Sequence, residues 1–214
     1  MIDIQTAAAM AAVLFLKKST SRSLSQIKAR LPRPRDHHFK GEFADRGKGV
    51  DFQMPNSSME KTLILYFRFV MSWTFLYAAS HQVFVPGWTV AGFLNHTKTF
   101  HDVFVVFTTP TMAPITTFLV EYGHLLIGLS LLTGLMVRVS ASFGVMLMII
   151  YWFAHMDWPF IENSNNLIVD YHLVYAGVLV YLIVKRAGHV FGLDGWMENL
   201  EFFKQHPGLK PLVA

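Results

Sequence analysis

The sequence predicts an all-α membrane protein, a bundle of four transmembrane helices with an interfacial segment between the first helix and the second. Composition is the first reason: 53% of the 214 residues are hydrophobic and 15% are charged, whereas soluble domains carry about 25% charged residues. The second is a series of four apolar runs between residues 62 and 185, each near the ~20 residues that cross a bilayer. The third is the concentration of basic residues in one N-terminal segment.

Residues 1–61 are expected to form a basic cytoplasmic tail. The apolar run at residues 6–16 is too short to span a bilayer, and basic residues follow it instead of preceding it as in a signal peptide. We therefore expect a short helix lying on the membrane or on a partner. Residues 17–50 hold ten Lys and Arg against three acidic residues. Since aromatic residues for base stacking are nearly absent there, this segment is predicted to bind anionic lipid and not nucleic acid.

The predicted membrane helices are the apolar runs at residues 62–85, 111–136, 139–157 and 166–185. Residues 86–110, between the first two, combine Trp and Phe with too many polar groups to face lipid, so they are expected to be interfacial or re-entrant. Residues 62–196 thus make a four-helix membrane domain, and residues 197–214 a cytoplasmic C-terminal tail.

The distribution of positive charge predicts the orientation in the membrane. Arg138 follows the second helix, and Lys185 and Arg186 end the fourth, on the same side as the basic tail. On the opposite side, Lys98 is the only Lys or Arg in the predicted loops. Because loops rich in Lys and Arg stay inside, both termini of this multi-pass protein are expected in the cytoplasm, with the helices in the plasma membrane.

Ionisable residues inside the predicted helices are candidates for function, because burying them in a bilayer is costly. They are Arg68, His81, Glu121, His124, His155, Asp170 and His172. Counting along each helix at about 1.5 Å per residue places all of them except Arg68 in the outer half of the membrane. The outer half is therefore where a site is expected.

Glu121 and His124 are three residues apart, so they share one face of a helix. A carboxylate beside an imidazole suits a quinone site, because one group can bind a carbonyl oxygen and both can relay protons. Gly128 lies one turn further on and leaves room for a neighbouring helix or a flat ligand. His81 and His155 are further candidates for quinone contact. The alternative, that these groups form hydrogen bonds between helices and only fix the bundle, stays open.

Metal and haem cofactors are not expected. The chain has no Cys, which excludes disulfides, thiolate metal sites and iron–sulfur clusters. Glu121 and His124 form half of a di-iron motif, but the second half is missing. Asp170 and His172 are two residues apart, a spacing that predicts different faces of one helix, and His124 and His172 are at mismatched depths for a shared haem. A redox role would therefore need a quinone.

The chain resembles the DoxX/DoxD family over about residues 62–196. The resemblance rests on Arg68, on the run from Glu121 to Gly128, on residues 133–138, and on Asp170-Tyr-His172 followed by Ala187-Gly188 and Gly192-Leu-Asp194. The family includes the DoxD-type subunit of thiosulfate:quinone oxidoreductases. The resemblance implies a four-helix membrane fold and quinone-linked electron transfer, often beside a terminal oxidase.

Two hypotheses of function follow. In the first, the chain is a membrane subunit that passes electrons from a reduced sulfur donor such as thiosulfate to the quinone pool. Glu121 and His124 would contact quinone, and Asp170 and His172 would relay protons or position the donor. In the second, the chain is a non-catalytic accessory subunit, docked through its basic tail into a larger respiratory or other membrane complex. A small-solute transporter is disfavoured because the sequence shows no inverted repeat.

Overall fold

The computed structural model describes residues 57–213, so the predicted helix at residues 6–16 and the basic segment up to residue 56 lie outside it. In the described range, three helices are long and apolar enough to cross a membrane: α2 (Ser58–Val83), α5 (Met112–Thr133) and α6 (Val137–Ala154). A fourth apolar helix, α7 (Tyr171–Val184), is shorter. The chain is therefore a mostly helical membrane protein, as the sequence predicts.

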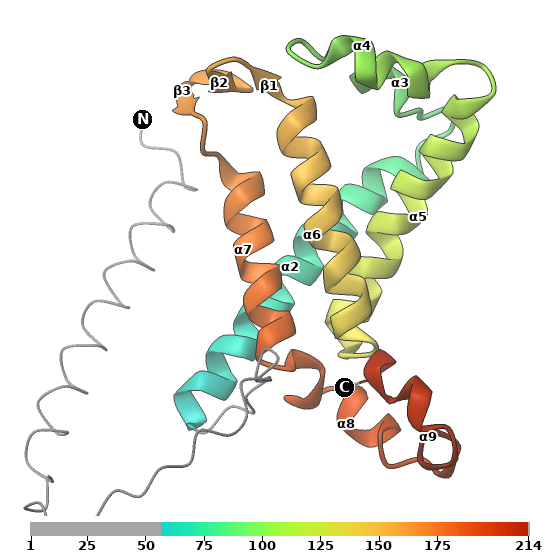
Figure 1. The fold of residues 1–214 in the computed structure, drawn as a ribbon, viewed down its shortest axis with the longest axis vertical. Coiled ribbons are helices and arrows are strands. Elements are labelled where there is room, and N and C mark those ends of the chain that lie inside the picture. Colours follow the sequence, from blue (N-terminus) through green and yellow to red (C-terminus); the bar gives the residue numbers. More distant parts are fainter. Residues whose placement is uncertain (1–56, 214) are drawn as a thin grey trace, which may run out of the picture. The chain divides into compact units, whose positions relative to one another are not determined.

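The helices run between two ends of the fold (Figure 1). We call the end where α2 begins and α7 stops the terminal end, because the C-terminal elements also lie there. We call the opposite end the sheet end, because it carries a small β-sheet and the short helices that follow α2. Ser57 starts α2 at the terminal end by accepting the backbone N–H of Glu60, which satisfies one of the free donors of the first turn.

Helix α2 packs closely on α5. The Ser72 hydroxyl donates a 2.8 Å hydrogen bond to the carbonyl of Gly128, and a Cβ at Gly128 would lie 2.7 Å from Leu76 Cγ. The room that Gly128 leaves is thus filled by a neighbouring helix. Helix α6 packs on α7, and the buried side chains of all four helices meet in one core that includes Ile64, Met71, Phe75, Ile127, Leu131, Ala141, Met148, Leu179 and Leu182.

The prediction that the fourth helix covers residues 166–185 is wrong at the N-terminal end of that helix. Residues Asn163–Leu167 form strand β3, which completes an antiparallel sheet of order β1-β2-β3 with β1 (Met156–Asp157) and β2 (Phe160–Ile161). Helix α7 begins only at Tyr171, because Asp170 is extended and caps it. Its 14 residues span about 21 Å at ~1.5 Å per residue, less than the ~30 Å of a hydrocarbon core.

Short helices cover both ends of the bundle. Residues 86–110 contain α3 (Ala91–Leu94), α4 (His101–Phe104) and η1 (Val105–Thr108). They pack on the sheet ends of α5 and α6 through a buried cluster of Val90, Leu94, Phe104, Val120 and Ala154. The end of the predicted membrane domain forms η2 (Ala187–His189) and α8 (Asp194–Met197), and the segment predicted as a C-terminal tail, residues 197–214, contains α9 (Glu201–Gln205) and η3 (Pro207–Leu212).

Candidate functional site

A set of polar side chains from all four long helices or their caps lies towards the sheet end. We call this set the polar chain; its members are Gln82, His124, Tyr151, His155, Asp170 and His172. Four of them were predicted as site residues, and they are His124, His155, Asp170 and His172. The structure brings these four close to one another through Tyr151 and through contact between imidazole rings.

His124 occupies the middle of α5 and is 3% exposed. Its Nδ1 lies 2.8 Å from the Oε1 atom of Gln82, and its Nε2 lies 3.4 Å from the Tyr151 hydroxyl. Because an amide oxygen can only accept, Nδ1–H is the donor, and Nε2 is left to accept from Tyr151. His124 thus connects α2 to α6, with both ring nitrogens engaged.

Asp170 and His172 form a buried hydrogen-bonded pair, with Nδ1 of the imidazole 2.5 Å from Oδ2 of the carboxylate. The prediction that they occupy different helix faces is wrong. Asp170 is the N-cap of α7 and not part of the helix, so its extended backbone turns the carboxylate towards the next turn. The other oxygen, Oδ1, accepts the backbone N–H of His172 at 3.1 Å. The carboxylate therefore both orients the imidazole of His172 and caps the N-terminus of α7.

His155 lies against His172, with ring centroids 4.8 Å apart and 32° between the planes. Its Nδ1 lies 2.9 Å from the carbonyl oxygen of Tyr151, so that nitrogen donates. Phe93, from α3, lies on His155 at 4.6 Å between centroids. Within residues 57–213 no hydrogen bond reaches Nε2 of His155 or of His172. Two adjacent imidazoles therefore each carry a nitrogen that can accept a further hydrogen bond.

Two predicted site residues lie apart from the polar chain. Glu121 is half-buried on α5, and within the described range no hydrogen bond or ion pair joins it to His124 or to another residue. His81 is exposed and its Nδ1 lies 3.0 Å from the carbonyl of Tyr77. Gln82, the next residue, is the one that reaches His124 from α2. Sequence reasoning missed Gln82 and Tyr151 because neither side chain is charged or an imidazole. The position of Tyr151 one helical turn before His155 was the available signal.

An apolar pocket of about 880 Å³ lies between α5 and α6. Its lining runs from Leu94 and Phe104 at the sheet end to Met136 at the terminal end. Tyr151 belongs to this lining as well as to the polar chain. The volume falls within the roughly 300–1,000 Å³ typical of small-molecule sites. The polar chain is therefore adjacent to a space that can hold an apolar molecule.

Arg68, the one candidate outside the sheet-end half, has a structural role at the terminal end. It is 3% exposed, and its guanidinium donates to the carbonyls of Ala187 and Val190, both at 2.8 Å, and of Phe191 at 3.1 Å. These three acceptors belong to the segment that follows α7. Arg68 thus ties the C-terminal segment to α2 and contacts no member of the polar chain.

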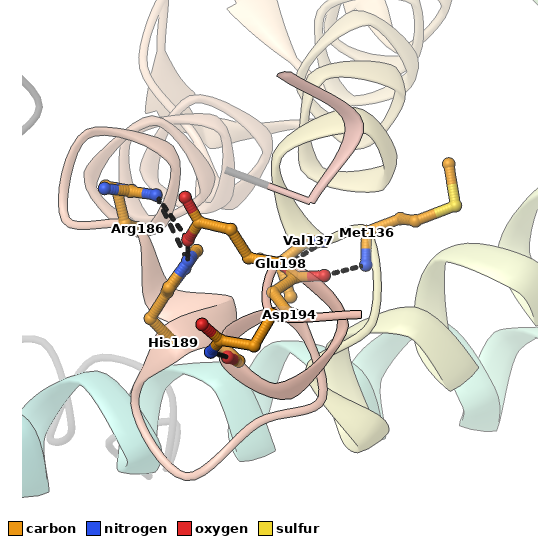
Figure 2. A network of polar contacts seen from close by, with 8 residues as sticks. Met136, Val137, Arg186, His189, Asp194 and Glu198 are labelled. Atoms are coloured by element: carbon orange, nitrogen blue, oxygen red, sulfur yellow. Dashed lines mark hydrogen bonds and ion pairs between the residues drawn. The ribbon is translucent and has the colours of Figure 1, made fainter. Parts of the chain in front are cut away.

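Asp194 extends this connection to the start of α6 (Figure 2). Its carboxylate accepts the backbone N–H groups of Met136 at 2.5 Å and Val137 at 3.1 Å, which caps α6 from a distant part of the chain. Burial raises the pKa of Asp194, and those two N–H donors oppose the rise. A Cβ at Gly188 would overlap the Asp194 carboxylate. The Ala187-Gly188 and Gly192-Leu-Asp194 motifs therefore hold the fold together.

A second ion-pair group is also shown in Figure 2. His189 Nε2 lies 2.8 Å from Glu198 Oε2, and Arg186 Nη2 lies 3.3 Å from the same oxygen. The hydrogen bond from His189 lowers the pKa of Glu198. These residues link η2 to α8, outside the apolar helices, and they add to the attachment of the C-terminal segment.

Comparisons with known proteins find no matching family model, curated protein or solved structure. Across residues 57–213 there is also no group of three or more His, Asp or Glu side chains placed to hold a metal ion. What the polar chain can do follows from its own chemistry. It offers imidazole acceptors, a phenol and a buried carboxylate, which can bind a polar ring and carry protons.

Proposed function

We propose that this chain is an integral membrane subunit of a quinone-linked electron-transfer system, in which electrons pass from a reduced sulfur donor such as thiosulfate to the quinone pool. The observation that carries the proposal is the polar chain beside the apolar pocket, with Tyr151 common to both. The resemblance of residues 62–196 to the DoxX/DoxD family supports the same function. We place the quinone ring against the polar chain.

The chemistry of quinone reduction explains why these residues suit it. A quinone takes up two electrons from the donor and two protons, and each carbonyl oxygen becomes a hydroxyl. His155 and His172 can accept hydrogen bonds from those hydroxyls at their free Nε2 atoms, and the Tyr151 oxygen, whose own proton goes to His124 Nε2, can accept one as well. Asp170 holds His172 with its proton on Nδ1, which leaves Nε2 available for exchange with the quinone. The ring site that we propose thus keeps His124, through its contact with Tyr151, and leaves out the predicted Glu121.

The proposed topology has four membrane spans, with α7 as the fourth. Residues 86–110 would lie at the outer interface, and both termini would face the cytoplasm from the plasma membrane. This orientation is supported by the placement of Lys61, Arg138 and Lys185 at the terminal end. Lys98, at the sheet end, is neutralised by Asp157 at 2.5 Å. Since the chain has no Cys, Asn165→Cys should react with an impermeant thiol reagent added outside cells, and Asn199→Cys should react only after lysis.

The functional test is thiosulfate-dependent quinone reduction by the protein purified with any native partners. We expect His172→Gln to lower turnover by about 10²-fold, the lower range for loss of a proton-transfer group. His206→Gln, an exposed histidine in the C-terminal segment, is the matched control and should leave turnover unchanged. Equal turnover in the wild-type protein and His172→Gln would remove the proposed site.

A non-catalytic accessory subunit is the second candidate. The observation in its favour is that Asp170 and His172, and likewise His124 and Gln82, bond to each other as structural pairs do. In that case His172→Gln would lower the yield of an assembled complex and leave the turnover per assembled complex unchanged. Native co-purification followed by turnover measurement on the intact complex separates the two functions.

A further inference from the structure

We infer that the pocket between α5 and α6 is a binding site for the isoprenoid tail of a quinone, with the ring at the sheet end. The inference rests on the proposed function and adds the part of the substrate that the polar chain does not recognise. Tyr151 supplies the connection, because it lines the pocket and its hydroxyl lies 3.4 Å from His124 Nε2. A molecule in the pocket therefore reaches the polar chain only where it approaches Tyr151.

Four hydroxyl groups along the pocket are already bonded within the protein, whereas the Tyr122 hydroxyl, also in the lining, makes no hydrogen bond within residues 57–213. Ser130 and Ser140 bond each other at 2.6 Å, and Ser130 also donates to the carbonyl of Leu135. Thr116 and Thr133 donate to carbonyls of their own helix at 3.0 Å and 2.9 Å. These four side chains offer no free donor to a ligand, so apart from Tyr122 the pocket presents an apolar wall. Such a wall suits a hydrocarbon chain and not a polar solute.

The direction and reach of the pocket also fit a tail. Tyr151 lies near the sheet end of α6, and Ser140 lies about 16 Å further towards the terminal end at ~1.5 Å rise per residue. Side chains along the rim face outwards, with Leu126 64% and Met146 53% exposed. A tail can therefore enter sideways from the hydrocarbon region and lie along the two helices.

The absence of cationic side chains from the pocket favours a quinone over a phospholipid. The lining contains no Lys or Arg, so a phosphate head group at Tyr151 would have no cation to pair with in the pocket. A quinone ring is uncharged and needs no cation, and a hydroxyl of its reduced form can donate to the Tyr151 oxygen, which lines the pocket. The occupant we assign is thus a neutral ring with a long apolar chain.

Gly123 allows a direct test because it lines the pocket and a Cβ there would meet nothing within 4 Å. Gly123→Leu should fill part of the tail site, with open space at its Cβ. Gly177→Leu is the matched control: Gly177 is also helical with open space around it, and it is not part of the pocket lining. Met146→Trp, at the exposed rim, is a second filling variant should Gly123→Leu fold poorly.

The measurement is equilibrium binding, in nanodiscs, of a benzoquinone with an isoprenoid tail and of the same ring without a tail. We expect the tailed quinone to bind the wild-type protein more tightly. Gly123→Leu should weaken binding of the tailed quinone by about tenfold, as when about two methylene groups lose their burial. Binding of the tailless quinone to Gly123→Leu, and of either quinone to Gly177→Leu, should stay within about twofold of the wild type.

The outcomes separate the tail site from the function on which it rests. If the wild-type protein binds neither quinone, the proposed function fails and the tail site with it. If both quinones bind equally well, or if neither filling variant weakens the tailed quinone, the tail site is overturned while the ring site stands. A phospholipid or second copy of the chain that Gly123→Leu displaces, with quinone binding unaltered, would also overturn the tail site.

Discussion

Replacing Arg68 with Met should release the C-terminal segment from the bundle. Hydrogen bonds to a charged group contribute about 1.5–3 kcal/mol each, and Arg68 donates to three carbonyls of residues 187–191. Part of that gain is offset by the cost of burying the charge, and removing one partner of a buried charged interaction costs about 3–5 kcal/mol in measured cases. We therefore expect Arg68→Met to lower the free energy of unfolding by about 3–5 kcal/mol.

The assay is thermal unfolding in detergent, followed by tryptophan fluorescence, which includes the signal of Trp196 in the C-terminal segment. For a domain of this size about 1 kcal/mol shifts Tm by roughly 2–4 °C, so the expected loss is about 10 °C. Lys61→Met, an exposed cation on the same helix, is the control and should change stability by less than about 0.5 kcal/mol. Equal Tm values for Arg68→Met and Lys61→Met would refute the reasoning.

Two further predictions concern the same end of the fold. The hydrogen bond from His189 lowers the pKa of Glu198 in the folded state. The ionised Glu198 therefore stabilises the fold above its unfolded pKa of about 4.3, and this stability is lost as the pH falls through the folded pKa. Tm should drop on acidification, and Glu198→Gln should reduce this drop. Gly188→Ala places a Cβ against the Asp194 carboxylate and should cost about 1–3 kcal/mol in chemical unfolding, while Gly208→Ala, in open space, should cost little. A pH profile unchanged by Glu198→Gln, or equal stability of the two alanine variants, would contradict these assignments.

Hydrophobic length was sufficient to predict α2, α5 and α6, because a helix that satisfies its own backbone can fill each apolar run. Hydrophobic length did not predict the start of the fourth helix, because turn formation and helix capping determine the backbone conformation of residues 163–170. Asn residues favour turns over helix interiors, and the Asp170 carboxylate accepts a backbone N–H of the first turn, so α7 begins at Tyr171. The β-sheet before it has no hydrophobic alternation that would have indicated strands.

The candidate site could be predicted only in part. Four members of the polar chain could be predicted because charged groups and imidazoles are rare inside apolar runs: His124, His155, Asp170 and His172. The same reasoning did not find Gln82 and Tyr151, which carry no charge and become significant only once the helices are packed against His124. Spacing also paired Glu121 with His124, although the partners of His124 come from other helices. Helix periodicity predicts which residues are neighbours within one helix, but it does not predict contacts between helices.

The central claim is that a quinone ring occupies the polar chain and its tail the adjoining pocket. Photolabelling with a quinone that carries a photoreactive group on its ring tests this most directly, with the labelled peptides identified by mass spectrometry. We predict labelling of the α6 peptide that contains Tyr151 and His155, abolished by an excess of unmodified tailed quinone. Labelling that excess quinone does not reduce, or labelling confined to peptides outside the polar chain and the pocket, would contradict the claim.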